Sequence, residues 1–92
     1  EYRIDPNITH EFVKAMRELG HALKSEGLAY WEIFQDPLDT SHYIEIRIAE
    51  TWTEHMRQHE RITKNIQFME DKIRALVKDG TPPIVSHYIA KG

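Results

Sequence analysis

Hydrophobic positions near the start of the chain recur with the period of an α-helix. The apolar stripe consists of Ile8, Phe12, Ala15, Met16, Leu19 and Leu23. These positions lie on one side of a helix, and charged residues occupy the other side. Asp5 and Pro6 precede the stripe as an N-cap and a first helical residue, and Gly27 follows it. The pattern predicts an amphipathic helix from Pro6 to near Gly27.

A second helical pattern begins at Thr51 and Glu54, which have the spacing of a capping box. Its stripe consists of Trp52, His55, His59, Ile62, Ile66, Met69, Ile73 and Leu76. The segment is long for one helix of a small domain. β-Branched and asparagine residues cluster at residues 62–65, so we expect a break there.

The remaining segments have the composition of strands. Residues 28–35 and 43–48 flank a Pro-containing turn at residues 36–39 and predict a hairpin. Residues 2–4 and 84–90 predict a first and a last strand. In the second hairpin strand Ile44, Ile46 and Ile48 alternate with Tyr43, Glu45 and Arg47. We expect the isoleucine face to pack on the helices.

This order of elements predicts an α+β fold of the ferredoxin-like βαββαβ type, with both helices on one face of a four-stranded antiparallel sheet. The opposite face would then carry aromatic residues and a few charges, which suit a partner sheet better than solvent. We therefore expect a homodimer through this face. The alternative is a monomer whose sheet is exposed to solvent on one face. The predicted interface consists of Tyr30, Phe34, Tyr43, Arg47 and Tyr88.

Length and composition limit the classes of function that the chain can have. The 92 residues, with no cysteine and a formal charge of -3, suit one small domain over residues 1–92. Basic residues are scattered among acidic ones, which argues against nucleic acid as a partner. The apolar runs are too short for this segment to insert directly into a membrane. Because the chain starts without Met, inside an expected strand, we expect a domain excised from a longer polypeptide.

Histidines are the main candidates for chemistry. His55 and His59 lie one helical turn apart, and His87 on the last strand is expected on the helix side. Such a group suits a metal, a proton relay, a pocket wall or hydrogen bonding within the core. No carboxylates are placed beside the pair, so we expect neither a metal nor a cofactor. With Trp52 and Trp31, these histidines are predicted to line a pocket for an aromatic or amphipathic small molecule, although core packing explains Trp31 alone better.

Residues 51–63, Thr-Trp-Thr-Glu-His-Met-Arg-Gln-His-Glu-Arg-Ile-Thr, form a specific motif. The motif resembles a Trp-x-Glu-His-x-Arg-Gln-His-Glu-Arg-x-Thr stretch in the soluble C-terminal domain of major facilitator transporters of the transmembrane secretion effector family. Residues 2–6, 31–36, 43–45 and 82–87 also resemble that domain in order and spacing. The resemblance covers nearly the whole chain.

That domain is in turn similar to antibiotic biosynthesis monooxygenase domains, which form dimeric α+β barrels. The resemblance implies a cytoplasmic dimerisation and small-molecule-sensing domain of a membrane exporter, tethered to the inner face of the cell membrane. The alternative it implies is a cofactor-independent monooxygenase, or a haem-degrading relative, acting on polycyclic phenols or quinols. Trp52 best matches the Trp of such active sites. Asn7 and Asn65 lie outside the strand positions of a catalytic Asn, so we favour the non-enzymatic interpretation.

Overall fold

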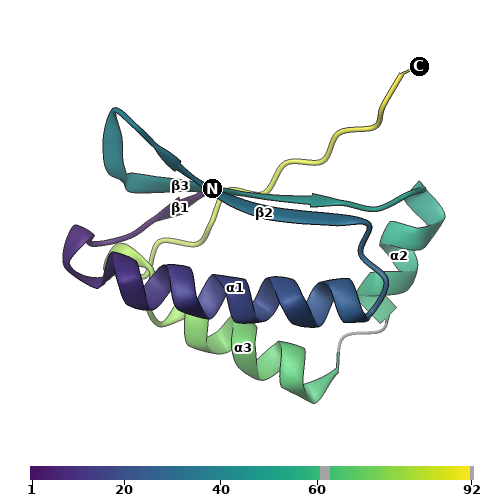
Figure 1. Cartoon of the computed structure of the whole chain (residues 1–92), viewed down its shortest axis with the longest axis horizontal. Coiled ribbons are helices and arrows are strands. Elements are labelled where there is room, and N and C mark those ends of the chain that lie inside the picture. Colours follow the sequence, from purple (N-terminus) through teal and green to yellow (C-terminus); the bar gives the residue numbers. More distant parts are fainter. Residues whose placement is uncertain (61–62, 92) are drawn as a thin grey trace.

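The computed structural model describes residues 1–60 and 63–91, without the side chains of Gln58 and His59. Its elements in chain order are β1 (Tyr2–Arg3), the 3-10 turn η1 (Pro6–Ile8), α1 (Thr9–Ser25), β2 (Tyr30–Asp36), β3 (Asp39–Ile48), α2 (Trp52–Glu60), α3 (Lys64–Arg74) and the 3-10 turn η2 (Lys78–Gly80). As Figure 1 shows, α1 and α3 lie side by side beneath one face of the sheet, and α2 lies at one end. The chain has an α+β fold.

Side-chain caps fix where the helices begin. The Asp5 carboxylate accepts a hydrogen bond from the Asn7 amide at the start of η1. Thr51 Oγ1 accepts from the Glu54 amide at 3.0 Å, and Thr63 Oγ1 accepts from the Ile66 amide at 3.1 Å. The predicted start at Thr51 and the break between α2 and α3 are confirmed, whereas Asp5 caps the 3-10 turn η1 and α1 itself begins at Thr9. Ile62 of the predicted stripe lies outside the described residues.

The described strands form an antiparallel sheet in the order β1-β3-β2. The predicted hairpin is confirmed, since β2 and β3 pair from Tyr30 with Ile48 to Asp36 with Asp39. β1 is short and pairs with β3 through Tyr2 and Arg3. The described sheet therefore has three strands where the sequence predicted four.

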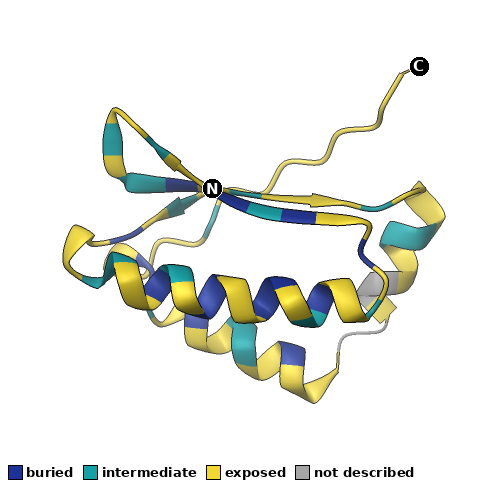
Figure 2. Cartoon of the chain, in the orientation of Figure 1, coloured by how far each residue is buried: buried dark blue, intermediate teal, exposed yellow. Residues whose placement is uncertain are grey.

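The hydrophobic core lies between the sheet and the two helices α1 and α3, as the dark blue segments of Figure 2 show. Phe12 is fully buried and its ring lies 5.0 Å from that of Tyr43 and 5.5 Å from that of Tyr2, centroid to centroid. The buried core consists of Ile4, Phe12, Ala15, Met16, Leu19, Leu23, Leu28, Trp31, Ile33, Tyr43, Ile66, Ile73 and Val77. The predicted stripe of α1 is confirmed as the core face of that helix.

The expected orientation of β3 is wrong. Tyr43 is buried, whereas Ile44, Ile46 and Ile48 are exposed on the face away from the helices. Alternation along a strand separates two faces but does not say which one meets the helices. Tyr43 and Arg47 therefore lie on the helix side and cannot belong to the outer face that the predicted interface requires.

The predicted last strand is also not formed. Residues 84–90 follow η2 as an exposed segment without assigned strand structure, seen as the rising yellow end of the chain in Figure 1. Its first residue hydrogen-bonds to the residue before β1: the Glu1 ammonium donates to the Ile84 carbonyl at 2.7 Å, and the Ile84 amide donates to the Glu1 carbonyl at 3.1 Å. Tyr88, another predicted interface residue, is 91% exposed on this segment.

Candidate functional site

Three rings that the sequence predicted to meet lie together at one end of the molecule. The Trp52 and His55 ring centroids are 5.0 Å apart, and those of Trp52 and His87 are 6.1 Å apart. The His55 and His87 rings are 5.1 Å apart with an interplanar angle of 67°. We call Trp52, His55 and His87 the ring cluster.

Local sequence explains how the ring cluster forms. The capping box starts α2 at Trp52, so His55 follows on the same helix face three residues later. His87 comes from the C-terminal segment on the other side. The Trp52 side chain remains 53% exposed and His55 is half-buried, so an aromatic face and imidazoles are accessible together. Such a surface can stack on a planar aromatic molecule and hydrogen-bond its polar groups.

The other two predicted pocket residues, Trp31 and His59, do not join the ring cluster in the described part of the structure. Trp31 is only 5% exposed and lies in the core, packed tightly against Gly20 of α1. The Arg17 guanidinium lies 5.9 Å from its ring centroid. Core packing is therefore the role of Trp31. His59 lies on α2, but its side chain is outside the described part of the structure.

A polar network on the helix side of the sheet was not predicted. The Glu45 side chain is only 8% exposed, and it accepts hydrogen bonds from Trp31 Nε1 at 2.7 Å and from Arg47 Nε at 3.0 Å. The Tyr2 hydroxyl donates to its other oxygen at 3.2 Å. Arg47 also lies 3.6 Å from Glu70 of α3. The predicted orientation of β3 puts Glu45 and Arg47 on the outer face, whereas in the structure both lie on the helix side.

This network has an electrostatic consequence for Tyr2. Burial, followed by the negative charge of Glu45, raises the pKa of the Tyr2 hydroxyl above its ordinary value. The hydroxyl therefore stays protonated and keeps donating to Glu45. With every polar group of Glu45 satisfied by a donor, burial of this charge is compensated.

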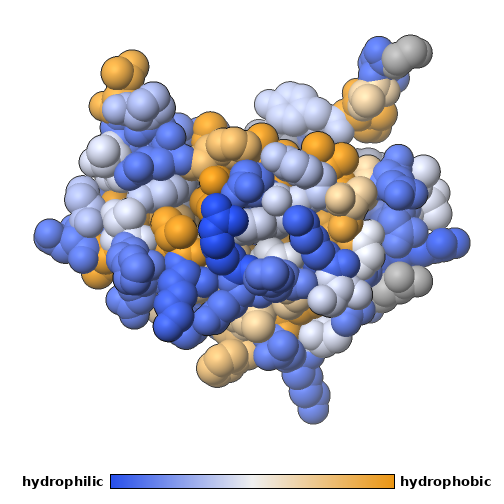
Figure 3. Space-filling model, in the orientation of Figure 1, coloured by the Kyte–Doolittle hydropathy of each residue, from blue (hydrophilic) through white to orange (hydrophobic). Residues whose placement is uncertain are grey.

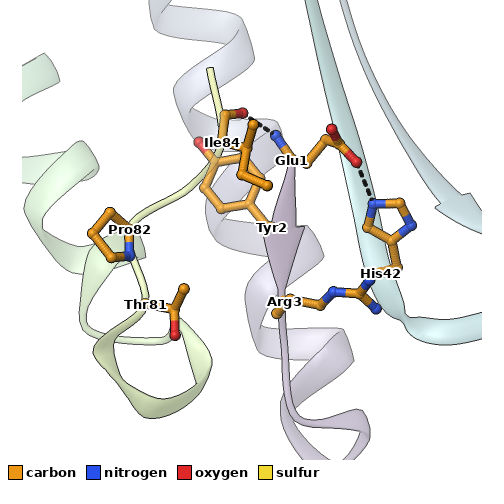
Figure 4. Close-up of a pocket in the computed structure, with 7 residues that line it drawn as sticks. All are labelled: Glu1, Tyr2, Arg3, His42, Thr81, Pro82 and Ile84. Carbon is orange, nitrogen blue, oxygen red and sulfur yellow. Dashed lines mark hydrogen bonds and ion pairs between the residues drawn. The ribbon is translucent and has the colours of Figure 1, made fainter. Parts of the chain in front are cut away.

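A small cleft lies at the junction of β1 and the C-terminal segment (Figure 4). It has a volume of about 70 Å³ and is lined by Glu1, Tyr2, Arg3, His42, Thr81, Pro82 and Ile84. Small-molecule sites usually measure roughly 300 Å³ or more, so this cleft is too small for one. A neighbouring cavity of about 380 Å³ is lined by Arg74, Val77, Gly80, Thr81, Pro82 and Pro83. Neither space includes a member of the ring cluster.

His42 is the histidine among the residues that line the small cleft. Its Nε2 lies 2.7 Å from Glu1 Oε1 and its Nδ1 lies 3.2 Å from Asp36 Oδ2. Hydrogen bonds to Asp36 and then to Glu1 raise the pKa of His42. These two contacts link β3 to the N-terminal residue and to the end of β2.

The outer face of the sheet carries a set of neighbouring exposed apolar side chains. The outer apolar face consists of Tyr30, Phe34, Ile44, Ile46 and Ile48, each between 38% and 49% exposed. Register makes them neighbours, because Tyr30 pairs with Ile48 and Phe34 pairs with Ile44. Apolar side chains gather along the upper side of the molecule in Figure 3, where Figure 1 places the sheet. Glu32 of β2 pairs with Ile46 on the same face, and its carboxylate forms an ion pair with Arg17 at 3.0 Å.

The family of the chain follows from a comparison over its whole length. The model of the transmembrane secretion effector family matches residues 1–92. The chain belongs to this family. No curated protein and no solved structure matches this transmembrane secretion effector chain significantly.

Two further findings bear on the context of this transmembrane secretion effector chain. Within residues 1–60 and 63–91, no helix combines the length and apolar character needed to cross a membrane. The side chains described there include no group of three or more histidines and carboxylates placed to hold a metal ion. The family name thus connects the chain to membrane exporters, while the ring cluster and the outer apolar face are the features left to explain.

Proposed function

We propose that these 92 residues are the dimerisation and small-molecule-sensing domain of a membrane exporter, excised from a longer chain. The domain lies on the cytoplasmic side, tethered to the inner face of the cell membrane. The family match supports the link to an exporter. The observation that carries the proposal is the outer apolar face, which the helices leave uncovered.

An antiparallel sheet can leave one face to water, but such a face normally carries polar residues. Here three isoleucines of β3 lie opposite Tyr30, Glu32 and Phe34 of β2, so five apolar side chains surround one carboxylate. Contiguous exposed apolar surface of this kind marks an interaction site. A second copy is the natural partner, because a two-fold interface uses the same patch on both subunits. Two such sheets packed face to face, each completed to a ferredoxin-like βαββαβ unit, make a dimeric α+β barrel.

A charge in the middle of the outer apolar face tests the dimer. We expect wild-type protein to sediment as a dimer and Ile46→Glu to sediment as a monomer with an unchanged circular dichroism spectrum. The matched control is Leu38→Glu, because Leu38 is 96% exposed at the hairpin turn, off this face. A monomeric wild type, or a dimer that withstands Ile46→Glu, would refute this part of the proposal.

The ring cluster supports a sensing role. We infer that a planar aromatic compound stacks on Trp52 and hydrogen-bonds to His55 and His87. A compound that favours one geometry of the dimer would shift the attached exporter by its differential affinity for the two geometries.

An NMR titration of the two indole signals tests the sensing role. Polycyclic phenols, quinols and haem are added in air, and the expected result is a saturable shift of the Trp52 indole. The buried Trp31 indole serves as an internal control and should stay in place. Trp52→Ala should abolish binding while the protein remains folded. Oxygen-dependent product signals would instead favour the cofactor-independent monooxygenase, and no shift with any compound would contradict sensing.

A further inference from the structure

A carboxylate lies among the residues of the outer apolar face. Glu32 of β2 is opposite Ile46 in the sheet register, and Tyr30 and Phe34 flank it on the same face of that strand. A charge in an apolar contact surface loses its hydration when the surface is covered, and this loss opposes association unless a partner charge compensates it. A dimer through the outer apolar face must therefore either compensate Glu32 or keep it at the margin of the contact.

Two donors hold the Glu32 carboxylate at the open edge of β2, which is an outer strand of the described sheet. The Ile33 amide donates to Glu32 Oε1 at 2.9 Å, as an amide on the unpaired side of an edge strand can. Arg17 Nη2 donates to the same oxygen at 3.0 Å. The Ile33 amide most, and then the charge of Arg17, lower the pKa of Glu32 from its ordinary value, so the carboxylate stays charged at neutral pH.

Arg17 reaches this edge from the other side of the sheet. It belongs to α1, which Figure 1 shows beneath β2. Its guanidinium lies 5.9 Å from the ring centroid of Trp31, which is buried on the helix side. Its Nη2 extends from there to Glu32, whose strand position belongs to the outer face. A cation of α1 thus neutralises a carboxylate of the outer face across the edge of β2.

We propose that Arg17 determines whether the outer apolar face can pair with a second copy, because it neutralises Glu32 and holds it at the strand edge. The inference rests on the proposed function, in which this face forms the dimer. A two-fold interface places the same patch of both subunits together. The two Glu32 side chains would then lie on facing sheets roughly 10 Å apart. Two uncompensated carboxylates in such an apolar contact repel each other and lack water, whereas two ion pairs carry no net charge.

The test measures the dissociation constant of the dimer by sedimentation equilibrium. Arg17→Met removes the charge but keeps an unbranched side chain to cover Trp31. The matched control is Arg74→Met, because Arg74 is also an exposed cation in an ion pair, with Asp71 at 3.5 Å, and its helix α3 lies on the helix side of the sheet. Both variants change the net charge equally. A rescue variant combines Arg17→Met with Glu32→Gln, which removes the carboxylate charge but can still accept from the edge amide.

Arg17→Met should weaken the dimer at least about tenfold relative to wild type and to Arg74→Met, since each dimer contains the ion pair twice. Adding Glu32→Gln should restore the wild-type dissociation constant or a lower one, which would not happen if Arg17→Met acted through packing on Trp31.

Equal dissociation constants for Arg17→Met and Arg74→Met, in a protein whose wild type dimerises, would overturn the role of Arg17 and leave the proposed dimer standing. A double variant as weak as Arg17→Met would overturn that role too. A wild type that stays monomeric would instead refute the proposed dimer, and this inference with it. Circular dichroism of each variant verifies that the fold is retained.

Discussion

The two faces of the sheet differ in how their side chains are partnered. On the helix side, Glu45 is a buried charge that receives hydrogen bonds from Trp31, Arg47 and Tyr2. On the other side, Ile44 and Ile46 are apolar and exposed. On the helix side this charge is thus covered and hydrogen-bonded beside the apolar core, whereas on the outer face apolar groups are left uncovered.

The two faces should therefore contribute to different properties, one to the stability of the fold and the other to association. A charge on the helix side costs little because each of its hydrogen-bonding groups is matched. An isoleucine on the outer face gains little from folding of the single chain, since it stays in water. Substitutions on the helix side should therefore change the stability of the fold, whereas substitutions on the outer face should change association.

Two phenylalanines give the largest expected contrast. Phe12→Ala removes a fully buried ring between Tyr2 and Tyr43, and should lower the free energy of unfolding by about 3–5 kcal/mol. Phe34→Ala, on the outer face, should cost less than about 1 kcal/mol in dilute monomer but weaken the dimer. Urea unfolding and sedimentation equilibrium measure the two effects. Equal losses of stability would remove the distinction between the faces.

Substitution of Glu45 should give the next largest change in the free energy of unfolding. Glu45→Gln replaces two acceptor oxygens by one oxygen and a donor, and should lower the free energy of unfolding by about 1–3 kcal/mol. The Trp31 indole proton signal should move with it. Glu32→Gln is the matched control on the same sheet, because its ion pair with Arg17 is partly exposed and screened by solvent, so its loss should change stability less. A loss for Glu45→Gln no greater than that of the control would show that the network is not stabilising.

A substitution at the contact between α1 and Trp31 should change the stability of the fold by a smaller net amount. A Cβ at Gly20 would overlap the Trp31 ring, and the overpacking cost of about 1–3 kcal/mol should outweigh the gain of up to about 1 kcal/mol from replacing a helical glycine. Gly20→Ala should therefore be destabilising in thermal unfolding. Adding Trp31→Phe, which removes the overlapping ring atoms, should make the double variant less destabilised than the sum of the two single changes. Strict additivity would contradict the clash.

His42 should give the smallest effect, visible as a pH dependence. Its pKa is raised in the folded protein by Asp36 and Glu1, so its contribution to stability is complete below about pH 6.5 and is lost as the pH rises through the folded pKa. Urea unfolding at about pH 6 and about pH 8 measures the loss. His42→Gln should remove this part of the dependence, whereas His10→Gln, at an exposed position of α1, should keep it. A wild-type pH profile in His42→Gln would contradict the role of this pair.

Features set by neighbouring residues were predictable from the sequence. The cap at Thr51 and the break before Lys64 depend on hydrogen bonds within one helical turn. The meeting of Trp52 and His55 follows from helical spacing. Their contact with His87 was also predicted, but from a last strand that the structure does not contain.

Features that depend on residues distant in the sequence were not predictable. The orientation of Ile44 and Ile46 depends on whether Glu45 finds donors inside the fold, and those donors come from β1 and β2. The role of Trp31 depends on a glycine of α1 that lets the ring approach the helix backbone. The predicted strand at residues 84–90 needs a neighbour along its length, and in the described part of the chain its backbone hydrogen bonds join Ile84 to Glu1.

The central claim is that the outer apolar face joins two copies of the chain. The most direct test mixes isotope-labelled and unlabelled protein and records intermolecular nuclear Overhauser effects by filtered NMR. The account predicts signals between the Ile46 methyl groups of one copy and the Phe34 or Tyr30 ring of the other. Intermolecular signals confined to other surfaces, or none at concentrations where a dimer sediments, would contradict it.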